Sequence, residues 1–366
     1  MSNTKDSKKK LIILCPYPLA GAPSQRFRYE QYLSILEEYG YQCQILSFLD
    51  EKTNQVLYQP RRTSKKAWGI VLGYLRRLSH VWQSRQADAV FIHREATPLG
   101  PPWVEWLVAQ VLRKPIIYDF DDAIWLADQS GVNRWVSRLK WRSKVRQICS
   151  WSYRVSGGNA YLANFGQQSG TVSVINPTTI DTEHYHNQLK NQHDEPLTIG
   201  WTGSHSTLKY LTPVTPALNL LAKSYNFRFV VIANRPPDFN LPNLAFIKWN
   251  KHTEIEDLLQ INIGIMPLPN DPWSKGKCGF KALQYLALGI PAVVSPVGVN
   301  TKIVQPDVHG FHALTEDDWY DSLQKLLTDN SLRKKMGQAG REHVINYYSI
   351  QSNTANFLRL FPGNWH

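Results

Sequence analysis

Ile263-Gly-Ile-Met-Pro-Leu-Pro269, followed by Lys277-Cys-Gly-Phe-Lys-Ala-Leu-Gln-Tyr-Leu-Ala-Leu-Gly-Ile-Pro-Ala-Val-Val-Ser295, is the stretch that decides the fold. Its first part extends an apolar, β-branched run from Ile261 to Leu268, which predicts a buried strand. A helix is predicted to start near Gly279 and to end at Gly289, where a turn leads into a second strand. The apolar face of this helix comprises Phe280, Leu283, Leu286 and Ala287.

A strand-loop-helix unit points the amino end of its helix beyond the carboxyl edge of the sheet. Free N–H groups and the helix dipole favour an anion at that place. Lys275, Lys277 and Lys281 add positive charge there. The residues themselves therefore predict a phosphate-binding crevice at the edge of a parallel sheet.

The same alternation of strands and helices recurs through all 366 residues and predicts two Rossmann-like halves. We place the N-terminal domain at residues 1–176, with a C-terminal helix at about 347–366, and the second domain at 177–346. A helix is also expected from Trp103 to Leu112. The predicted strands of the first half are Leu11–Cys15, Gln44–Phe48, Ala89–His93, Pro115–Asp122 and Val172–Ile175. Those of the second half begin near Leu197, Phe227 and Leu244, before the stretch quoted above.

Composition and charge narrow the class of protein. Hydrophobic content is 43%, and the four cysteines have no metal or disulfide spacing, so a reduced, cytoplasmic setting is expected. The apolar run Leu11–Cys15 is too short for a leader peptide, and no stretch approaches a membrane span. Net charge is +12. Nucleic-acid binding is disfavoured because no recognised module accompanies that charge.

Two basic segments interleave cations with tryptophan and leucine. One runs from Arg61 to Leu78, and the other from Arg134 to Arg146 at helical spacing. Such faces suit an anionic bilayer surface. The alternative is a solvated helix whose apolar side packs on its own domain. An anionic membrane surface is therefore a possible partner, and a peripheral location on its inner face is an expectation.

The stretch Gly276–Gly298 resembles the donor-sugar motif of retaining GT-B-fold glycosyltransferases of the family 4, or group 1, type. The run Leu283–Ser295 matches the family's Ala, Gly-x-Pro and Val-Val-x-Ser pattern. Gln284 stands where the family has its second Glu, and its first Glu is missing. The resemblance implies an α/β GT-B architecture, with two Rossmann-like domains facing each other across a cleft and a C-terminal helix returning to the N-terminal domain. The N-terminal domain would bind the acceptor, and the other domain the nucleotide sugar.

Candidate site residues follow from their places at strand ends and from this resemblance. The predicted catalytic residues are His93, Asp121 and Lys281. The predicted donor-binding residues are Gly21, Ser24, Gly203, Ser204, Lys209, Arg235, Trp249, Lys277, Lys281 and Gln284. The predicted acceptor-binding residues are Arg26, Arg28 and Asp122.

Several of these residues have a structural alternative. The lysines could be solvated, Trp249 could pack on its own helix, and Arg26 and Arg28 could be structural cations of the first helix. His93 resembles a family histidine that contacts the donor sugar, but a lone histidine is commonly a packed residue. Asp119, Asp121 and Asp122 form a carboxylate cluster in the first half. Because lysines and the helix dipole replace a metal in GT-B enzymes, no metal and no cofactor are expected.

The predicted function is a glycosyltransferase that moves a sugar from a nucleotide-diphosphate donor to an acceptor hydroxyl. Retention of the anomeric configuration and a role in polysaccharide or glycolipid synthesis are expected by analogy, with a saccharide or lipid-linked acceptor. The alternatives are a non-catalytic nucleotide-sugar-binding or scaffold homologue, motivated by the missing acidic pair, and a nucleotide-sugar epimerase of the same fold.

Overall fold

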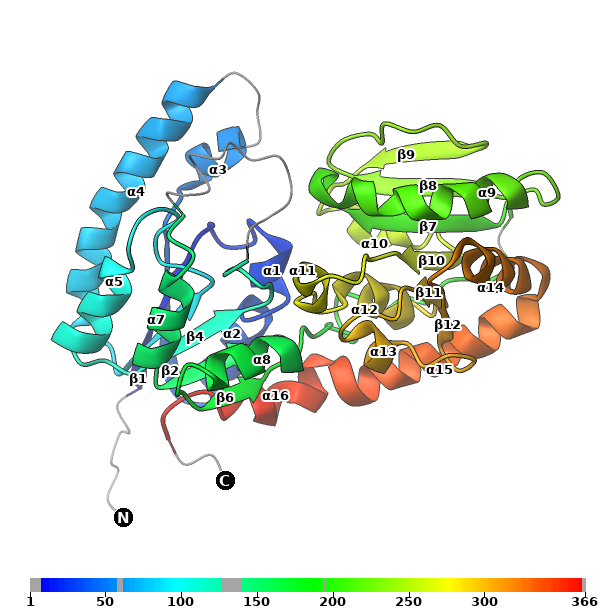
Figure 1. Cartoon of the computed structure of the whole chain (residues 1–366). Helices are drawn as coiled ribbons and strands as arrows, with labels where there is room; N and C mark the ends of the chain where they lie inside the picture. The colour runs from blue at the N-terminus through cyan, green and yellow to red at the C-terminus, as the bar shows by residue number, and fades with distance from the viewer. Residues whose placement is uncertain (1–7, 58–61, 127–139, 194, 364–366) are drawn as a thin grey trace, which may run out of the picture. The chain divides into compact units, whose positions relative to one another are not determined.

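A computed structural model describes residues 8–57, 62–126, 140–193 and 195–363. The chain divides into two compact units (Figure 1). Unit 1 comprises Met1–Thr178 and Asn353–His366, and unit 2 comprises Thr179–Ser352. The sequence-based boundaries were 176/177 and about 346/347. Each unit is an α/β layer structure built on a six-stranded, wholly parallel sheet.

The sheet of unit 1 has the strand order β2-β1-β3-β4-β5-β6. Its strands are β1 (Lys9–Cys15), β2 (Tyr41–Ser47), β3 (Ala89–His93), β4 (Ile116–Phe120), β5 (Arg154–Gly157) and β6 (Ser173–Ile175). The helices are α1 (Pro23–Arg26), η1 (Glu30–Tyr32), α2 (Leu33–Glu38), α3 (Glu51–Leu57), α4 (Thr63–Ser84), α5 (Trp103–Trp106), the π-helical η2 (Leu107–Val111), α7 (Lys144–Trp151) and α8 (Ala160–Gln167). The predicted strand Ala89–His93 is confirmed, whereas the helix predicted from Trp103 to Leu112 is divided between α5 and η2.

The sheet of unit 2 has the order β12-β11-β10-β7-β8-β9. Its strands are β7 (Thr198–Gly203), β8 (Arg228–Ala233), β9 (Leu244–Lys248), β10 (Ile263–Met266), β11 (Ala292–Val294) and β12 (Gly310–His312). The helices are η3 (His205–Val214), α9 (Thr215–Leu221), α10 (Glu254–Leu258), α11 (Pro272–Lys275), α12 (Phe280–Ala287), α13 (Asn300–Ile303), α14 (Glu316–Thr328) and α15 (Asn330–Tyr348). The core between sheet and helices is apolar and includes Trp201, Phe229, Ile265, Val293 and Trp319.

The last helix, α16 (Ile350–Leu358), carries the chain from unit 2 to unit 1, as predicted. Within unit 1 the Phe357 ring stacks on Tyr32 with the ring centroids 4.1 Å apart. The amide of Asn356 donates to the carbonyl of Ile175 at 2.9 Å. Burial of the two rings holds the end of the chain on the first unit.

Two segments bury polar residues that the periodicity did not place inside. Helix α12 is buried nearly all round, including Gln284 and Tyr285, because sheet and helix α15 cover opposite sides of it. Residues 134–139 of the second basic segment lie outside the described residues, and 140–143 are not helical. Lys144 in that segment is buried and pairs with Glu95 at 2.8 Å, so it is a structural cation. Within the described ranges no helix is long and apolar enough to cross a membrane.

Candidate active site

Both sheets reverse their strand order next to their first strand. In unit 1 the reversal lies between β1 and β3, and in unit 2 between β7 and β10. Ligands of parallel α/β sheets bind outside the carboxyl ends of the strands at such a switch point. The segments at these places are residues 16–24 and 94–97 in unit 1, and residues 203–204 and 267–279 in unit 2. The predicted site residues His93, Ser24, Gly203 and Lys277 lie on or beside these segments.

Gly203 and Lys281 lie next to each other at the end of β7. A Cβ atom on Gly203 would be 2.4 Å from the Trp201 ring and 2.9 Å from Cε of Lys281. The ammonium of Lys281 lies 5.4 Å from the centroid of the buried Trp201 ring. Glycine is therefore required at position 203, and the aromatic ring holds the lysine stem beside the switch point.

The helix that carries Lys281 begins at a glycine turn. Gly279 has φ 68°, and a Cβ atom there would be 2.1 Å from Cδ1 of Ile303. Gly289 at the other end has φ 69°, which confirms the predicted left-handed turn. Lys281 thus lies in the first turn of α12, where the free N–H groups add to its positive charge.

Several buried polar atoms of unit 2 have no hydrogen-bond partner among the described residues, and three of them belong to the segments around α12. The three are Nε2 of Gln284, Oδ1 of Asn300 and Oγ of Ser274. Gln284 is one turn beyond Lys281 on α12. Ser274 lies on α11, within the switch-point loop 267–279, and Asn300 is the first residue of α13, after the connection from β11. A buried polar group without a partner costs free energy, so these atoms indicate a polar ligand or water at this end of the sheet.

The remaining donor candidates of unit 2 lie at its surface. Lys209 and Arg235 are exposed, and Lys277 is half-buried with its ammonium 5.0 Å from the Trp273 ring centroid. Ser204 Oγ lies 2.9 Å from Ser206 Oγ. Trp249 donates from Nε1 to Glu254 at 3.2 Å, which supports its alternative as a residue packed on its own helix.

A buried hydrogen-bonded cluster lies at the carboxyl ends of β3 and β4 in unit 1. Asp119 accepts hydrogen bonds from Nδ1 of His93 at 2.8 Å and from the Ser156 hydroxyl at 2.5 Å, and it pairs with the guanidinium of Arg28. Burial alone would raise the pKa of Asp119, but the charge of Arg28 and the contact with His93 hold it below its usual range. Asp119 is therefore ionised, and it orients both the guanidinium of Arg28 and the imidazole of His93.

Arg28 has a structural role, and the prediction that it binds an acceptor loses support. Its side chain is fully buried and also donates to Ser156 at 3.1 Å and to the carbonyl of Asn176. Its donors are used inside unit 1. Arg26 is half-buried, with its guanidinium 4.9 Å from the Phe27 ring centroid.

His93 points one nitrogen at the first loop. Asp119 accepts the Nδ1–H, and the other ring nitrogen, Nε2, lies 3.5 Å from the Ser24 hydroxyl. The loop itself is held by Glu30, which accepts the Ala20 N–H at 2.9 Å and an amide hydrogen of Gln25 at 3.0 Å. Gly21 is exposed, and a Cβ atom there would be 2.8 Å from the Pro18 carbonyl.

Asp121 and Asp122 share one cation. Arg94 donates to each carboxylate at 2.7 Å from a left-handed backbone conformation with φ 61°. Burial opposes ionisation of Asp121, but the positive charge of Arg94 outweighs it and holds the pKa of Asp121 well below its usual range. So acidic a carboxylate is a weak proton acceptor. Among the described residues, no cluster of three or more His, Cys, Asp or Glu side chains could hold a metal ion.

Sequence reasoning did not assign roles to Asp119, Arg94, Gln25 or Glu30. The one available signal was register: His93 and Asp119 both end predicted strands, and in the sheet they are paired neighbours. Arg94 pairs with Asp121 and Asp122, and Glu30 accepts from Ala20 and Gln25. The spacing of residues in the sequence does not predict these pairings.

Comparison with known proteins bears on the family and the fold. Residues 239–343 match the family model described as glycosyl transferases group 1. No curated protein matches the chain by sequence. Among solved structures, sucrose-phosphate synthase from Thermosynechococcus elongatus is similar, with a TM-score of 0.72 and 11% identity over 96% of this chain and 98% of that one.

Two further solved structures have the same fold. A glycosyltransferase from Rickettsia africae has a TM-score of 0.68 and 12% identity, covering 98% of this chain and 100% of that one. HepE of Anabaena, solved with UDP-glucose, has a TM-score of 0.62 and 11% identity, covering 96% and 98%. These structures show that the chain has the GT-B fold, and the matched segment is similar to glycosyl transferases of group 1. The chain carries a group 1 glycosyltransferase segment in its second unit, which confirms the resemblance found in the sequence.

Proposed function

We propose that this enzyme transfers a sugar from a nucleoside-diphosphate donor to an acceptor hydroxyl, with retention of configuration. The observation that carries the proposal is the juxtaposition of Lys281 with Gly203 at the switch point of unit 2. The three unpartnered polar atoms at the same end of that sheet supply further hydrogen bonds to a donor. Because HepE is solved with UDP-glucose, uridine donors are the first to test.

Departure of the sugar leaves negative charge on the diphosphate. Lys281 and the amino end of α12 stabilise that charge, and such preorganised groups supply much of an enzyme's acceleration. Three more cations of unit 2 add to the positive electrostatic potential that attracts the diphosphate: Lys209 and Arg235, which are exposed, and Lys277, which is half-buried. No metal is needed in this scheme, since cations and N–H groups serve the diphosphate.

Unit 1 supplies the groups that orient the reacting sugar and the acceptor. Nε2 of His93 and the Ser24 hydroxyl form hydrogen bonds with hydroxyls of the sugar. Asp119 keeps the imidazole in one orientation. Asp121 and Asp122 orient an acceptor hydroxyl as hydrogen-bond acceptors. Proton abstraction by Asp121 is disfavoured because Arg94 lowers its pKa.

The acceptor we propose is a saccharide or a lipid-linked saccharide at the cytoplasmic face of a membrane, in polysaccharide or glycolipid synthesis. This proposal is supported by the basic, tryptophan-containing segment of unit 1. It accounts for a fold with no membrane-crossing helix among the described residues and for a cationic surface.

The test is a panel of UDP-, GDP-, ADP- and dTDP-sugars, measured by thermal stabilisation and by donor hydrolysis. One base is expected to stabilise the protein. Lys281→Ala should weaken that donor roughly ten- to hundredfold, the loss expected for a charge-assisted hydrogen bond. Lys325→Ala is the matched control, because Lys325 also lies over an aromatic ring of unit 2, at 5.5 Å from the Phe311 centroid.

Each outcome separates the candidate functions. Binding with no hydrolysis and no transfer to any saccharide would favour a scaffold, and an altered sugar configuration would identify an epimerase. No binding of any donor, or equal weakening by Lys325→Ala, would overturn the proposed donor site.

A further inference from the structure

Helix α4 carries its large apolar side chains on the side that faces solvent. Trp68, Val71, Leu75, Leu78 and Trp82 recur at alternating spacings of three and four, so they form one stripe on the helix. They are between 47% and 68% exposed. At 1.5 Å per residue the stripe is about 21 Å long. A single exposed leucine is ordinary, but a continuous stripe of this kind marks a surface that is covered in function.

The buried face of α4 is small and polar instead. It consists of Gly69, Gly73, Arg77, His80 and Ser84. A Cβ atom on Gly69 would be 2.3 Å from the Thr53 side chain, and one on Gly73 would be 2.6 Å from the Phe48 ring. The helix therefore packs closely on unit 1 through its glycines. The usual polarity of a surface helix is reversed.

Arg77 accounts for this reversal. It is fully buried and donates to the carbonyls of Cys15, Leu46 and Ala96, each at 2.7 Å. These bonds tie α4 to the ends of two strands and to the segment after a third. Attachment to the unit is thus through backbone hydrogen bonds and glycine contacts, and the apolar stripe takes no part in it.

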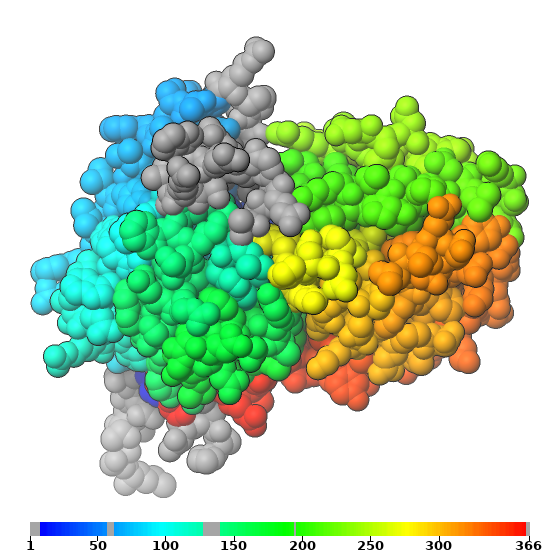
Figure 2. All heavy atoms as spheres, in the orientation of Figure 1, coloured from blue at the N-terminus to red at the C-terminus, as the bar shows by residue number. Residues whose placement is uncertain are grey.

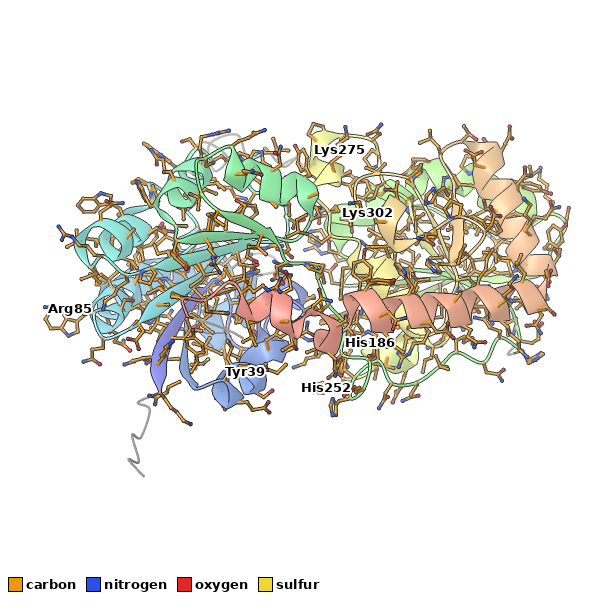
Figure 3. All side chains as sticks on the ribbon, turned by 90° about the horizontal axis from the view of Figure 1, so that it is seen from below. Tyr39, Arg85, His186, His252, Lys275 and Lys302 are labelled. Carbon is orange, nitrogen blue, oxygen red and sulfur yellow. The ribbon has the colours of Figure 1, made fainter. Side chains whose placement is uncertain are left out.

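All charged residues of α4 are cations, although Arg77 is buried and Arg76 pairs with Asp50 at 3.2 Å. Between Glu51 and Asp88 the sequence contains no acidic residue. Its cations there are Lys52, Arg61, Arg62, Lys65, Lys66, Arg76, Arg77 and Arg85. Arg85 lies over the Trp82 ring at 4.3 Å from the centroid and projects outward from unit 1 (Figure 3). Tryptophan at both ends of an apolar stripe, with adjacent cations, is the composition of a helix lying in a bilayer interface.

The neighbouring segment, α5 with η2, also has exposed apolar side chains next to cations. The π-helix η2 contacts α4, and Trp106 and Val111 on α5 and η2 are exposed. Arg113 and Lys114 follow at once. The space-filling view shows α4 and α5, in blue and cyan, at the surface of unit 1 (Figure 2).

We propose that the outer face of α4 is a membrane-binding surface that lies along a bilayer rich in anionic lipids. The apolar stripe would enter the boundary between head groups and acyl chains, and the flanking cations would contact the phosphates. A second copy of the chain is the poorer occupant, because a symmetric contact would bring two predominantly cationic faces together. The inference extends the membrane-face acceptor of the proposed function, but vesicle binding requires neither donor nor turnover.

The experiment is flotation of the full chain with vesicles of phosphatidylcholine mixed with phosphatidylglycerol, and with vesicles of phosphatidylcholine alone. Binding to the anionic vesicles is expected. Leu75→Glu should lower the partition coefficient at least about tenfold, since a leucine leaves the interface and a negative charge replaces it. Lys65→Gln and Arg85→Gln should each lower it about fivefold. The matched control is Leu314→Glu in unit 2, where the leucine is 64% exposed.

Thermal unfolding of each variant checks that the fold is intact, which is expected because the substituted side chains are exposed. Donor binding should be the same in Leu75→Glu as in the parent, so loss of vesicle binding is distinguished from failure of the donor site. The proposal is overturned if the parent protein does not float with anionic vesicles, or if Leu75→Glu and Leu314→Glu behave alike. It is also overturned if sedimentation velocity without lipid shows a dimer that Leu75→Glu dissociates.

Discussion

Nδ1 of His93 donates a hydrogen bond to Oδ2 of Asp119 across neighbouring strands, at 2.8 Å and wholly buried. The two residues are register partners at the carboxyl ends of β3 and β4. Asp119 also pairs with Arg28, so one carboxylate balances a buried guanidinium and orients an imidazole at the switch point of unit 1. This arrangement joins the stability of the unit to the geometry of its candidate site.

Asp119→Asn should destabilise the protein by about 3–5 kcal/mol, because it leaves the buried charge of Arg28 without its partner. Urea unfolding at neutral pH measures the change. Asp122→Asn is the control: Asp122 is less buried and shares Arg94 with Asp121, so its loss should cost about 1 kcal/mol or less. Equal losses in the two variants would contradict the structural role of Asp119.

His93→Gln should keep the fold but lower donor hydrolysis by roughly ten- to hundredfold. The glutamine amide can still donate to Asp119, but it no longer places an imidazole nitrogen near Ser24. Initial rates with the donor identified in the panel measure the effect. His252→Gln, at an exposed histidine of unit 2, should leave both the rate and the melting temperature unchanged. An unchanged rate in His93→Gln would assign the histidine to packing alone.

Gln284→Leu should weaken donor binding roughly three- to tenfold, the loss of one neutral hydrogen bond. Stability should hardly fall, because Nε2 of Gln284 has no partner among the described residues of the free protein. Gln192→Leu is the control and should give the opposite pattern. The amide of Gln192 donates to the carbonyls of Asn262 and Gly289 at 3.3 and 3.2 Å. Its loss should therefore lower the stability and leave the affinity for the donor unchanged. Calorimetric titration beside thermal unfolding distinguishes the two patterns.

Lowering the pH should destabilise the protein through His343. Burial and the nearby His309 lower the pKa of His343 to about 4, and the ring centroids are 4.4 Å apart. Between that value and the ordinary pKa of about 6.5, the unfolded chain binds a proton that the folded chain does not. The free energy of unfolding therefore falls as the pH drops through this window.

His343→Phe should make that fall shallower. Urea unfolding at neutral pH and at about pH 4.5 measures the difference. His80, whose pKa burial also lowers to about 4, leaves a residual slope of the same sign. His252→Phe, at an exposed histidine, is the control and should leave the pH dependence of the free energy of unfolding unchanged. The same pH dependence in His343→Phe as in His252→Phe would contradict the role given to His343.

Several features of the fold and site were predictable from local sequence. The strand Ala89–His93, the start of α12 next to Gly279, the turn at Gly289 and the lysine at the amino end of α12 all appear where the pattern places them. Period-two and period-three-to-four patterns report local backbone geometry, and only glycine adopts positive φ without strain. Strand-helix alternation then leaves few topologies for a parallel sheet.

The tertiary structure decided which face of each element is covered and which distant groups meet. Arg28 and Asp119 are 91 positions apart, Lys144 is buried by an ion pair, and α12 is enclosed on nearly every side. On α4 the glycines and Arg77 face inward and the apolar stripe faces outward. Periodicity shows that a helix has two unlike faces. Which face is buried depends on the residues that other segments bring against it, and the chain must fold before those residues are neighbours.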